Sequence, residues 1–224
     1  MGALLSIDVG ALPRAERRRR TILDAALRVI AAGGPDAVTH RRVAAEARVP
    51  LGSTTYYFAT RDDLVREAFL HYLDEATGFL AAIEREHAPV SRAAVVDLLV
   101  DVARREFTDT VMVRAEYELV LYAARDETLA RAFNRYEHGL ETRLAETLER
   151  LGAHRPKDAA RTLIDVVRGF EIEGLTRPAI ELADLERRLF PVVRALTSPS
   201  ARNGAKRKSG ERRSLSRRTG RNTP

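Results

Sequence analysis

The sequence predicts an all-α fold with about nine helices, and two patterns support this prediction. Apolar residues recur at intervals of three and four positions along most of the 224 residues, which is the spacing that gathers them on one face of a helix. No segment alternates apolar and polar residues between Asn-Gly or Asp-Gly turns, as paired strands would. Hydrophobic residues make up 45% of the chain, so packed helices can bury a substantial core.

Three helices are expected in residues 14–60, which we call the head. The first spans about 14–32 and ends at Gly33-Gly34-Pro35, because Gly caps a helix and Pro cannot continue one. Thr39 is placed to cap a second helix of about 40–47. After the turn Arg48-Val49-Pro50, a third short helix covers about 51–57.

Six longer helices are expected in residues 61–197, which we call the body. Their predicted ranges are about 61–86, 91–107, 110–124, 126–151, 156–176 and 181–197. Ser91 is placed to cap the second of them. Residues 1–13 read as a disordered arm, and residues 198–224 as a disordered tail with almost nothing apolar.

Charge is distributed unevenly along the chain. Residues 1–60 carry nine basic and five acidic side chains, residues 61–197 carry 20 and 26, and residues 198–224 carry nine and one. The net charges of head, body and tail are therefore +4, −6 and +8. A basic head indicates contact with a polyanion. Two roles fit the basic tail, namely nonspecific affinity for DNA and a merely solubilising appendage.

Several function classes find no support in the sequence. The chain has no cysteine, and no two of its five histidines have the i, i+4 spacing of a helical metal site. It has no Gly-rich phosphate loop and no nucleophile elbow, and Glu116 and Glu118 point to different sides of their predicted helix. We therefore expect no enzyme, metal or cofactor. No apolar stretch approaches the roughly 20 residues of a membrane span, so we expect a cytoplasmic protein without membrane contact.

The order of elements in the head is that of a helix-turn-helix DNA-binding unit. Its second helix must be short and polar on its outer face, because that face enters the major groove. The segment Leu51 to Tyr57 meets this need with hydroxyl groups, a glycine and two tyrosines. The arginines of residues 17–20 fit either DNA contact or a solvated helix start.

At this point the sequence resembles the TetR family of one-component repressors. The resemblance covers about 50 residues and rests on the spacing of Ile22, Ala25-Ala26, Gly33, Val43-Ala44, Ala47-Arg48-Val49, Gly52-Ser53, Tyr56-Tyr57-Phe58 and Arg61-Asp62-Asp63-Leu64. Two positions depart from the family pattern. Arg48 stands where the family usually has Gly, and Thr54-Thr55 where it usually has an apolar residue followed by an aromatic one.

The resemblance implies DNA-contacting roles for matching residues of the head. The positions that touch phosphates are Thr39, Tyr56, Tyr57 and Arg61. The positions that face bases are Arg41, Leu51, Gly52, Ser53 and Thr55. Arg41 is favoured for a guanine contact, since Arg bound to guanine is the commonest specific pairing. Packing of Tyr56 and Tyr57 against the next helix is the alternative role for these two side chains.

The resemblance also implies a body that forms a homodimer and binds a small-molecule effector. The candidate interface residues are Leu163, Val167, Leu185, Leu189, Val192 and Val193, of which half could equally be intramolecular core. The candidate pocket residues are Tyr72, Phe79, Phe107, Tyr117, Leu121, Phe133, Tyr136 and Phe170, and plain core packing is the alternative for each. Polar residues beside these faces are Arg114, Glu118, Asn134, Glu137, His138, Arg168 and Glu173.

The function that follows is sequence-specific regulation of transcription. We expect a repressor that leaves a pseudo-palindromic, double-stranded DNA operator when a small hydrophobic effector binds. The effector would shift a population between two head spacings, with the helix of about 61–86 as the lever. An activator of the same family fits the sequence equally, and a nonspecific architectural DNA-binding protein fits it less well because of the large acidic body.

Overall fold

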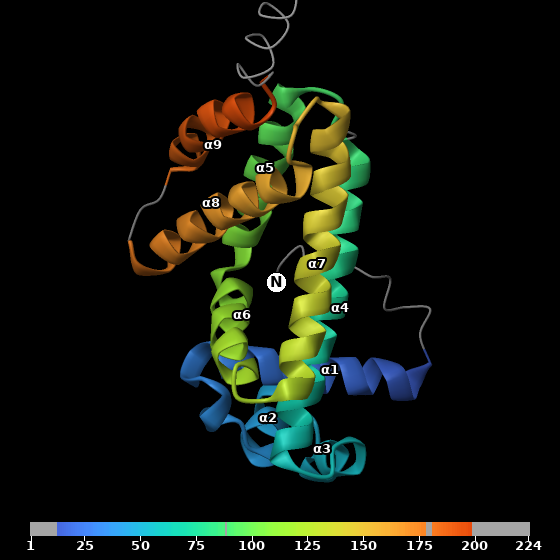
Figure 1. Cartoon of the computed structure of the whole chain (residues 1–224). Helices are drawn as coiled ribbons and strands as arrows, with labels where there is room; N and C mark the ends of the chain where they lie inside the picture. The colour runs from blue at the N-terminus through green and yellow to red at the C-terminus, as the bar shows by residue number, and fades with distance from the viewer. Residues whose placement is uncertain (1–12, 88, 178–180, 199–224) are drawn as a thin grey trace, which may run out of the picture.

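The computed structural model describes residues 13–87, 89–177 and 181–198, and within these ranges it contains nine α-helices and no strand (Figure 1). Two short 3₁₀ turns, η3 (Pro35–Ala37) and η4 (Phe107–Asp109), join them. The helices are α1 (Arg14–Gly33), α2 (His40–Ala47), α3 (Leu51–Tyr57), α4 (Arg61–His87), α5 (Arg92–Glu106), α6 (Thr110–Ala123), α7 (Glu127–Arg150), α8 (Pro156–Thr176) and α9 (Leu182–Leu196). Each begins and ends within one residue of its expected position, so the all-α prediction is confirmed. The expected arm and nearly all of the expected tail lie outside the described residues.

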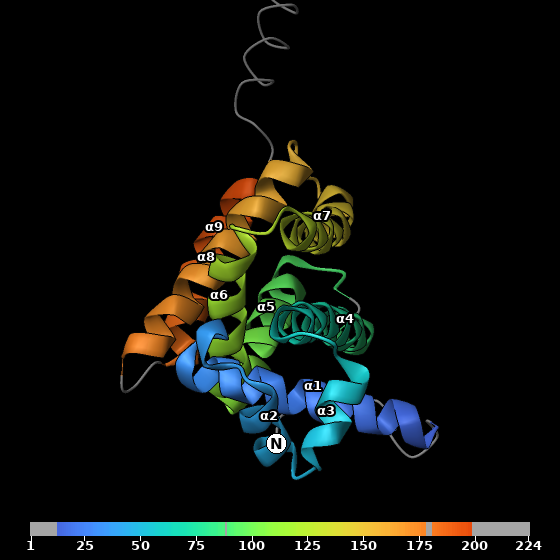
Figure 2. The ribbon, with the colours of Figure 1, turned by 90° about the horizontal axis from the view of Figure 1, so that it is seen from below.

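The head lies at one end of the molecule, and the long helices of the body extend away from it (Figures 1 and 2). Helices α4 and α7 pack side by side along the long axis and connect the head to the far end of the body. Helix α6 packs on α1, while α8 and α9 pack on α7 and α5 at the far end. No helix of the described segments is both long and apolar enough to cross a membrane.

Local interactions explain where several helices begin. The hydroxyl of Thr39 accepts a hydrogen bond from the backbone N–H of Arg42 at 3.1 Å, and that of Ser91 accepts one from Ala94 at 3.1 Å, so both predicted caps are confirmed. Thr60 and Asp63 form a reciprocal capping box at the start of α4, with N–H to side-chain distances of 3.0 and 3.1 Å. This box was not among the caps expected from the sequence.

The hydrophobic core consists of two clusters. The lower cluster joins α1 and α2 to the adjoining parts of α4, α6 and α7, and its largest fully buried side chains include Ile22, Leu64, Phe69, Leu119 and Leu129. The upper cluster joins α5, α7, α8 and α9. The lower cluster contains residues from both sides of the expected boundary between residues 60 and 61, so head and body share one continuous core there. The head is tied by packing to the lower ends of α4 and α6.

The upper cluster corrects the sequence-based choice of interface residues. Five of the six candidates are buried within their own chain, namely Leu163, Val167, Leu185, Leu189 and Val193, and Val192 is half-buried against them. Side chains already buried in one chain have little area left for a second one. The large exposed apolar side chains on α8 and α9 are Ile172 and Phe190.

Candidate nucleic-acid interface and body cavity

Helix α3 presents one continuous exposed face. Leu51, Gly52, Thr55 and Tyr56 are exposed, and at 100° per residue they fall within an arc of about 140°. Tyr56 is 81% exposed, whereas Tyr57 and Ser53 are half-buried and Tyr57 packs against the lower cluster. A side chain added at Gly52 would meet no protein atom within 4 Å. The face is therefore open to an approaching partner.

The opposite face of α3, together with Phe58 directly after the helix, fixes α3 to the head. Thr54 and Phe58 are buried, at 0% and 2% exposure, and the Thr54 hydroxyl donates to the carbonyl oxygen of Leu51 at 2.8 Å. This bond explains how a threonine can stand at a position where an apolar residue is usual, because its hydroxyl is satisfied inside its own helix. Thr55, which follows, stays at the surface.

The turn between α2 and α3 contains a left-handed residue. Arg48 has φ 53° and ψ 46°, and no other non-glycine residue of the described ranges has a positive φ. Its N–H closes the end of α2 on the carbonyl of Ala45 at 3.1 Å. An L-residue in this conformation costs about 1–2 kcal/mol, which the glycine usual in the family at this position would avoid.

The first turns of α1 lie beside the exposed face of α3. Arg14 and Arg18, four residues apart, line a shallow hollow together with Gly52, Ser53 and Tyr56. Arg19 and Arg20 instead form ion pairs with Glu67 and Glu75 of α4. Two arginines of α1 thus face the hollow beside α3, and two others pair with α4. The sequence-based expectation treated residues 17–20 as one run and did not separate these roles.

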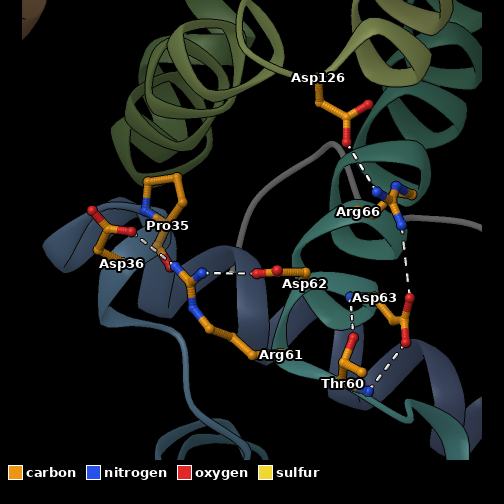
Figure 3. Close-up of polar contacts among 8 residues, drawn as sticks. All are labelled: Pro35, Asp36, Thr60, Arg61, Asp62, Asp63, Arg66 and Asp126. Atoms are coloured by element: carbon orange, nitrogen blue, oxygen red, sulfur yellow. Dashed lines mark hydrogen bonds and ion pairs between the residues drawn. The ribbon is translucent and has the colours of Figure 1, made fainter.

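Of the remaining DNA candidates, Thr39 and Arg41 are exposed. Arg61 instead binds other residues of the protein (Figure 3). The Arg61 guanidinium donates to the carbonyl oxygen of Pro35 at 2.7 Å and to the carboxylates of Asp36 at 2.9 Å and Asp62 at 2.8 Å. Arg61 thereby ties the start of α4 to η3. The sequence led us to expect that Arg61 contacts a DNA phosphate, whereas its guanidinium here binds groups of the protein itself.

A second polar connection joins α4 to α7 just above the head (Figure 3). Arg66 forms an ion pair with Asp126 at 3.0 Å, and Asp126 also accepts the backbone N–H groups of Thr128 and Leu129 at the start of α7. The Leu129 N–H and the Arg66 guanidinium lower the pKa of Asp126 below its ordinary value. Asp126 therefore remains a carboxylate and holds the α7 terminus against α4.

The body contains a cavity of about 470 Å³ between α4, α5, α6, α7 and α8, and this cavity is partly open to solvent. Apolar walls come mainly from α5, α7 and α8, with Leu98, Leu99, Val102, Leu140, Ile164 and Val167. Carboxyl groups of Glu106, Glu116 and Glu171 also line it, beside the Arg168 guanidinium and the Tyr136 ring. A partly apolar hollow with a few buried polar groups has the character of a small-molecule site.

Only Tyr136 of the eight pocket candidates lines this cavity. Tyr72, Phe79 and Phe170 are buried in the core clusters, Phe107 and Phe133 pack against them, and Leu121 is 69% exposed. Tyr117 lies behind the lining, where its hydroxyl donates to Glu171 at 2.9 Å. Of the polar candidates, Arg168 lines the cavity and Glu137 pairs with it at 2.6 Å. Five glutamates line the cavity, and none of them was expected there from the sequence: Glu84, Glu106, Glu116, Glu146 and Glu171.

Burial shifts the titration of these glutamates. Removal from water, followed by repulsion from Glu171, raises the pKa of Glu116 from 4.5 to about 7. The same two causes raise the pKa of Glu106 well above its ordinary value. Burial also raises the pKa of Glu137, although Arg168 opposes the shift. No group of three or more acidic or histidine side chains suited to hold a metal ion occurs in the described part of the chain.

A head with a firmly packed helix-turn-helix and an open outer face, carried on a helical body with a cavity between its helices, defines a DNA-binding regulator of transcription. Two family models match the chain. "Bacterial regulatory proteins, tetR family" matches residues 22–68, and "Tetracyclin repressor-like, C-terminal domain" matches residues 90–199. The chain belongs to the TetR family of transcriptional regulators.

Individual relatives agree with this assignment. The chain is 30% identical over 153 residues to the HTH-type transcriptional regulator BetI of Brucella suis biovar 1 (strain 1330). The matched region covers 66% of this chain and 76% of BetI. It is 24% identical over 169 residues to the nicotine-responsive transcriptional repressor HdnoR of Paenarthrobacter nicotinovorans, covering 72% and 86%. The solved structure of the multidrug binding protein EbrR complexed with ethidium is 32% identical, with a TM-score of 0.57, and covers 78% of this chain and 98% of that one.

Proposed function

We propose that this protein is a homodimeric repressor that binds a pseudo-palindromic operator and leaves it when a small molecule occupies the body cavity. The observation that carries the DNA-binding part is the exposed arc of α3, held by a buried opposite face and flanked by arginines of α1. Such a helix can enter a major groove while its neighbours neutralise phosphates.

The proposed base-contacting residues are Arg41, Leu51, Gly52, Ser53 and Thr55. Tyr56 and Thr39, with Arg14 and Arg18 added from the structure, are proposed to contact the phosphate backbone. Tyr57 and Arg61 contribute mainly by holding α3 and α4 in place, since one is half-buried and the other is bound to η3. The open space beyond Gly52 supports a close approach of DNA to this turn of α3.

The proposed dimer interface lies on α8 and α9. Ile172 and Phe190 are 50% and 53% exposed there, although both are large apolar side chains. On α8, Thr162, Asp165, Gly169 and Ile172 follow one another at intervals of three and four and are exposed, so they share a face. A two-fold contact through these helices would present two heads at a fixed spacing, as an operator with two half-sites requires.

Repression and ligand control are supported by relatives and by the cavity. HdnoR is a nicotine-responsive repressor, and EbrR was crystallised with ethidium. The cavity lies between helices that also reach the head, because α4 and α6 contribute to both. A ligand that favours one packing of these helices shifts the population of head spacings by its differential affinity.

The test is binding to a fluorescent duplex taken from upstream of the protein's own gene, in the presence of excess random DNA. Retained binding supports a specific regulator, while binding lost to competitor supports a nonspecific DNA-binding protein. Arg41→Ala should weaken specific binding by about 1–3 kcal/mol. Arg135→Ala removes the same charge from the exposed surface of α7 and should leave binding unchanged. A reporter gene then separates repressor from activator by the sign of the change.

A further inference from the structure

The inner end of the body cavity holds more negative than positive groups. Glu106 of α5, Glu116 of α6 and Glu171 of α8 line it, and Glu137 of α7 lies next to them. Arg168 is the guanidinium that serves this cluster, at 2.6 Å from Glu137 and 3.6 Å from Glu116. We call these four glutamates the acid cluster.

The other two arginines of the cavity are engaged elsewhere. Arg143 donates through Nε to Glu84 at 3.0 Å, and Arg150 donates to the hydroxyl of Thr147 at 2.9 Å. Neither has an ion pair with the acid cluster in the described part of the chain. The Nη2 atom of Arg143 is buried without an acceptor. An anionic ligand could satisfy it, so a test of ligand charge must include an anion.

Within the acid cluster, one carboxylate oxygen stands out. Oε2 of Glu106 is buried and has no hydrogen-bond partner among the described residues. Two neighbours are better satisfied, because Glu116 accepts the Tyr72 hydroxyl at 2.5 Å and Glu171 accepts the Tyr117 hydroxyl at 2.9 Å. A buried acceptor without a donor is costly, and a cation placed against it would remove that cost. Burial, followed by repulsion from Glu171, raises the pKa values of Glu106 and Glu116, and a cation bound among these groups would offset that repulsion.

We infer that the cavity binds an amphipathic organic cation, whose charged nitrogen or phosphorus centre lies against Glu106, Glu116 and Glu171 and whose hydrocarbon part lies against the apolar walls. The ring of Tyr136 lines the same space and can contact the charge through its π face. The inference rests on the proposed function, because it names the chemical class of the effector for the cavity proposed there.

The experiment uses the full chain and isothermal titration calorimetry at pH 8. The probes are two permanent cations of different size, tetraphenylphosphonium and benzyltrimethylammonium, and tetraphenylborate, an anion with the shape of the first. At least one cation should bind, and tetraphenylphosphonium should bind at least about tenfold more tightly than tetraphenylborate. Glu106→Gln and Glu116→Gln should each weaken cation binding by about tenfold or more.

Glu149→Gln is the matched control, because it removes the same charge from the exposed surface of α7 outside the cavity and should leave cation affinity unchanged. Far-UV circular dichroism checks that each variant is folded. Failure of both cations to bind, tighter binding of the borate, or unchanged cation affinity in both cavity variants would overturn the inference. These outcomes leave the DNA-binding result intact. A cation that binds through the glutamates without releasing DNA would instead sustain the inference and contradict the proposed effector role.

Discussion

Replacing Glu116 with Gln should stabilise the empty protein at alkaline pH and change little in acid. Burial raises the pKa of Glu116 from 4.5 to about 7, so between these pH values the folded state keeps a proton that the unfolded state has lost. The contribution of Glu116 to stability is therefore greatest below pH 4.5 and falls as the pH rises to about 7. At 1.36 kcal/mol per pKa unit, the loss is about 3 kcal/mol. Glutamine is neutral throughout and can still accept the Tyr72 hydroxyl.

The pH dependence belongs to a group of side chains rather than to Glu116 alone. The titratable and charged groups that surround it come from every helix that encloses the inner cavity, namely Tyr72, Glu106, Tyr117, Tyr136, Glu137, Arg168 and Glu171. Neutralising Glu116 also removes its repulsion from Glu106. Both effects act in the same direction and stabilise the variant at high pH.

Urea unfolding of the wild type and of Glu116→Gln at pH 5 and pH 8 measures this difference. Far-UV circular dichroism is the suitable signal because the chain has no tryptophan, and the protein concentration must be constant if the fold is dimeric. The expected gain of the variant is about 3 kcal/mol at pH 8 and about 1 kcal/mol or less at pH 5. Glu149→Gln should show no such difference. An equal gain at both pH values, or none at pH 8, would refute the argument from desolvation.

Two further predictions concern single residues. Arg48→Gly should stabilise the protein by about 0.5–1 kcal/mol in urea unfolding. Glycine relieves about 1–2 kcal/mol of left-handed strain, and this gain exceeds the entropic cost of ordering glycine on folding. A loss of stability would show that the turn is not strained. Leu163→Ala should cost about 2–5 kcal/mol, because Leu163 is fully buried in the upper cluster. If sedimentation showed instead a weakened dimer with unchanged stability, Leu163 would belong to the interface.

The helices could be predicted from the sequence because local signals agree with the tertiary structure. Gly34, with φ 73°, ends α1 at the predicted break, and the Thr39 cap starts α2 at the predicted residue. The helical periodicity also places apolar residues such as Ile22, Val29 and Phe69 on faces that are buried. Each of these features depends on neighbours a few residues away, which a sequence displays directly.

The cavity could not be predicted in the same way, because periodicity gives the apolar face of a helix and not its partner. Tyr72, Phe79 and Phe170 lie on apolar faces, yet their neighbours fill the space around them. The feature of the sequence that indicates the cavity is an acidic residue on the apolar face of a helix. Glu116 is buried between the positions of Met112 and Leu119, whereas Glu118 is half-exposed on another side of α6. The two carboxylates do point to different sides of α6, as expected, but burial of Glu116 beside a cavity was not predicted.

The position of Glu116 suggests how occupancy of the cavity could reach the head. Leu119 lies one turn further along α6 and is buried in the lower cluster with α1, while the Tyr72 hydroxyl connects Glu116 to α4. The free energy of about 3 kcal/mol associated with ionising Glu116 in its buried site is comparable to the 1–3 kcal/mol by which allosteric sites are usually coupled. A cation that relieves this cost only in one arrangement of α4 and α6 is therefore sufficient to shift the head. The coupling requires no contact between ligand and head, because both helices extend from the cavity to the core that holds α1.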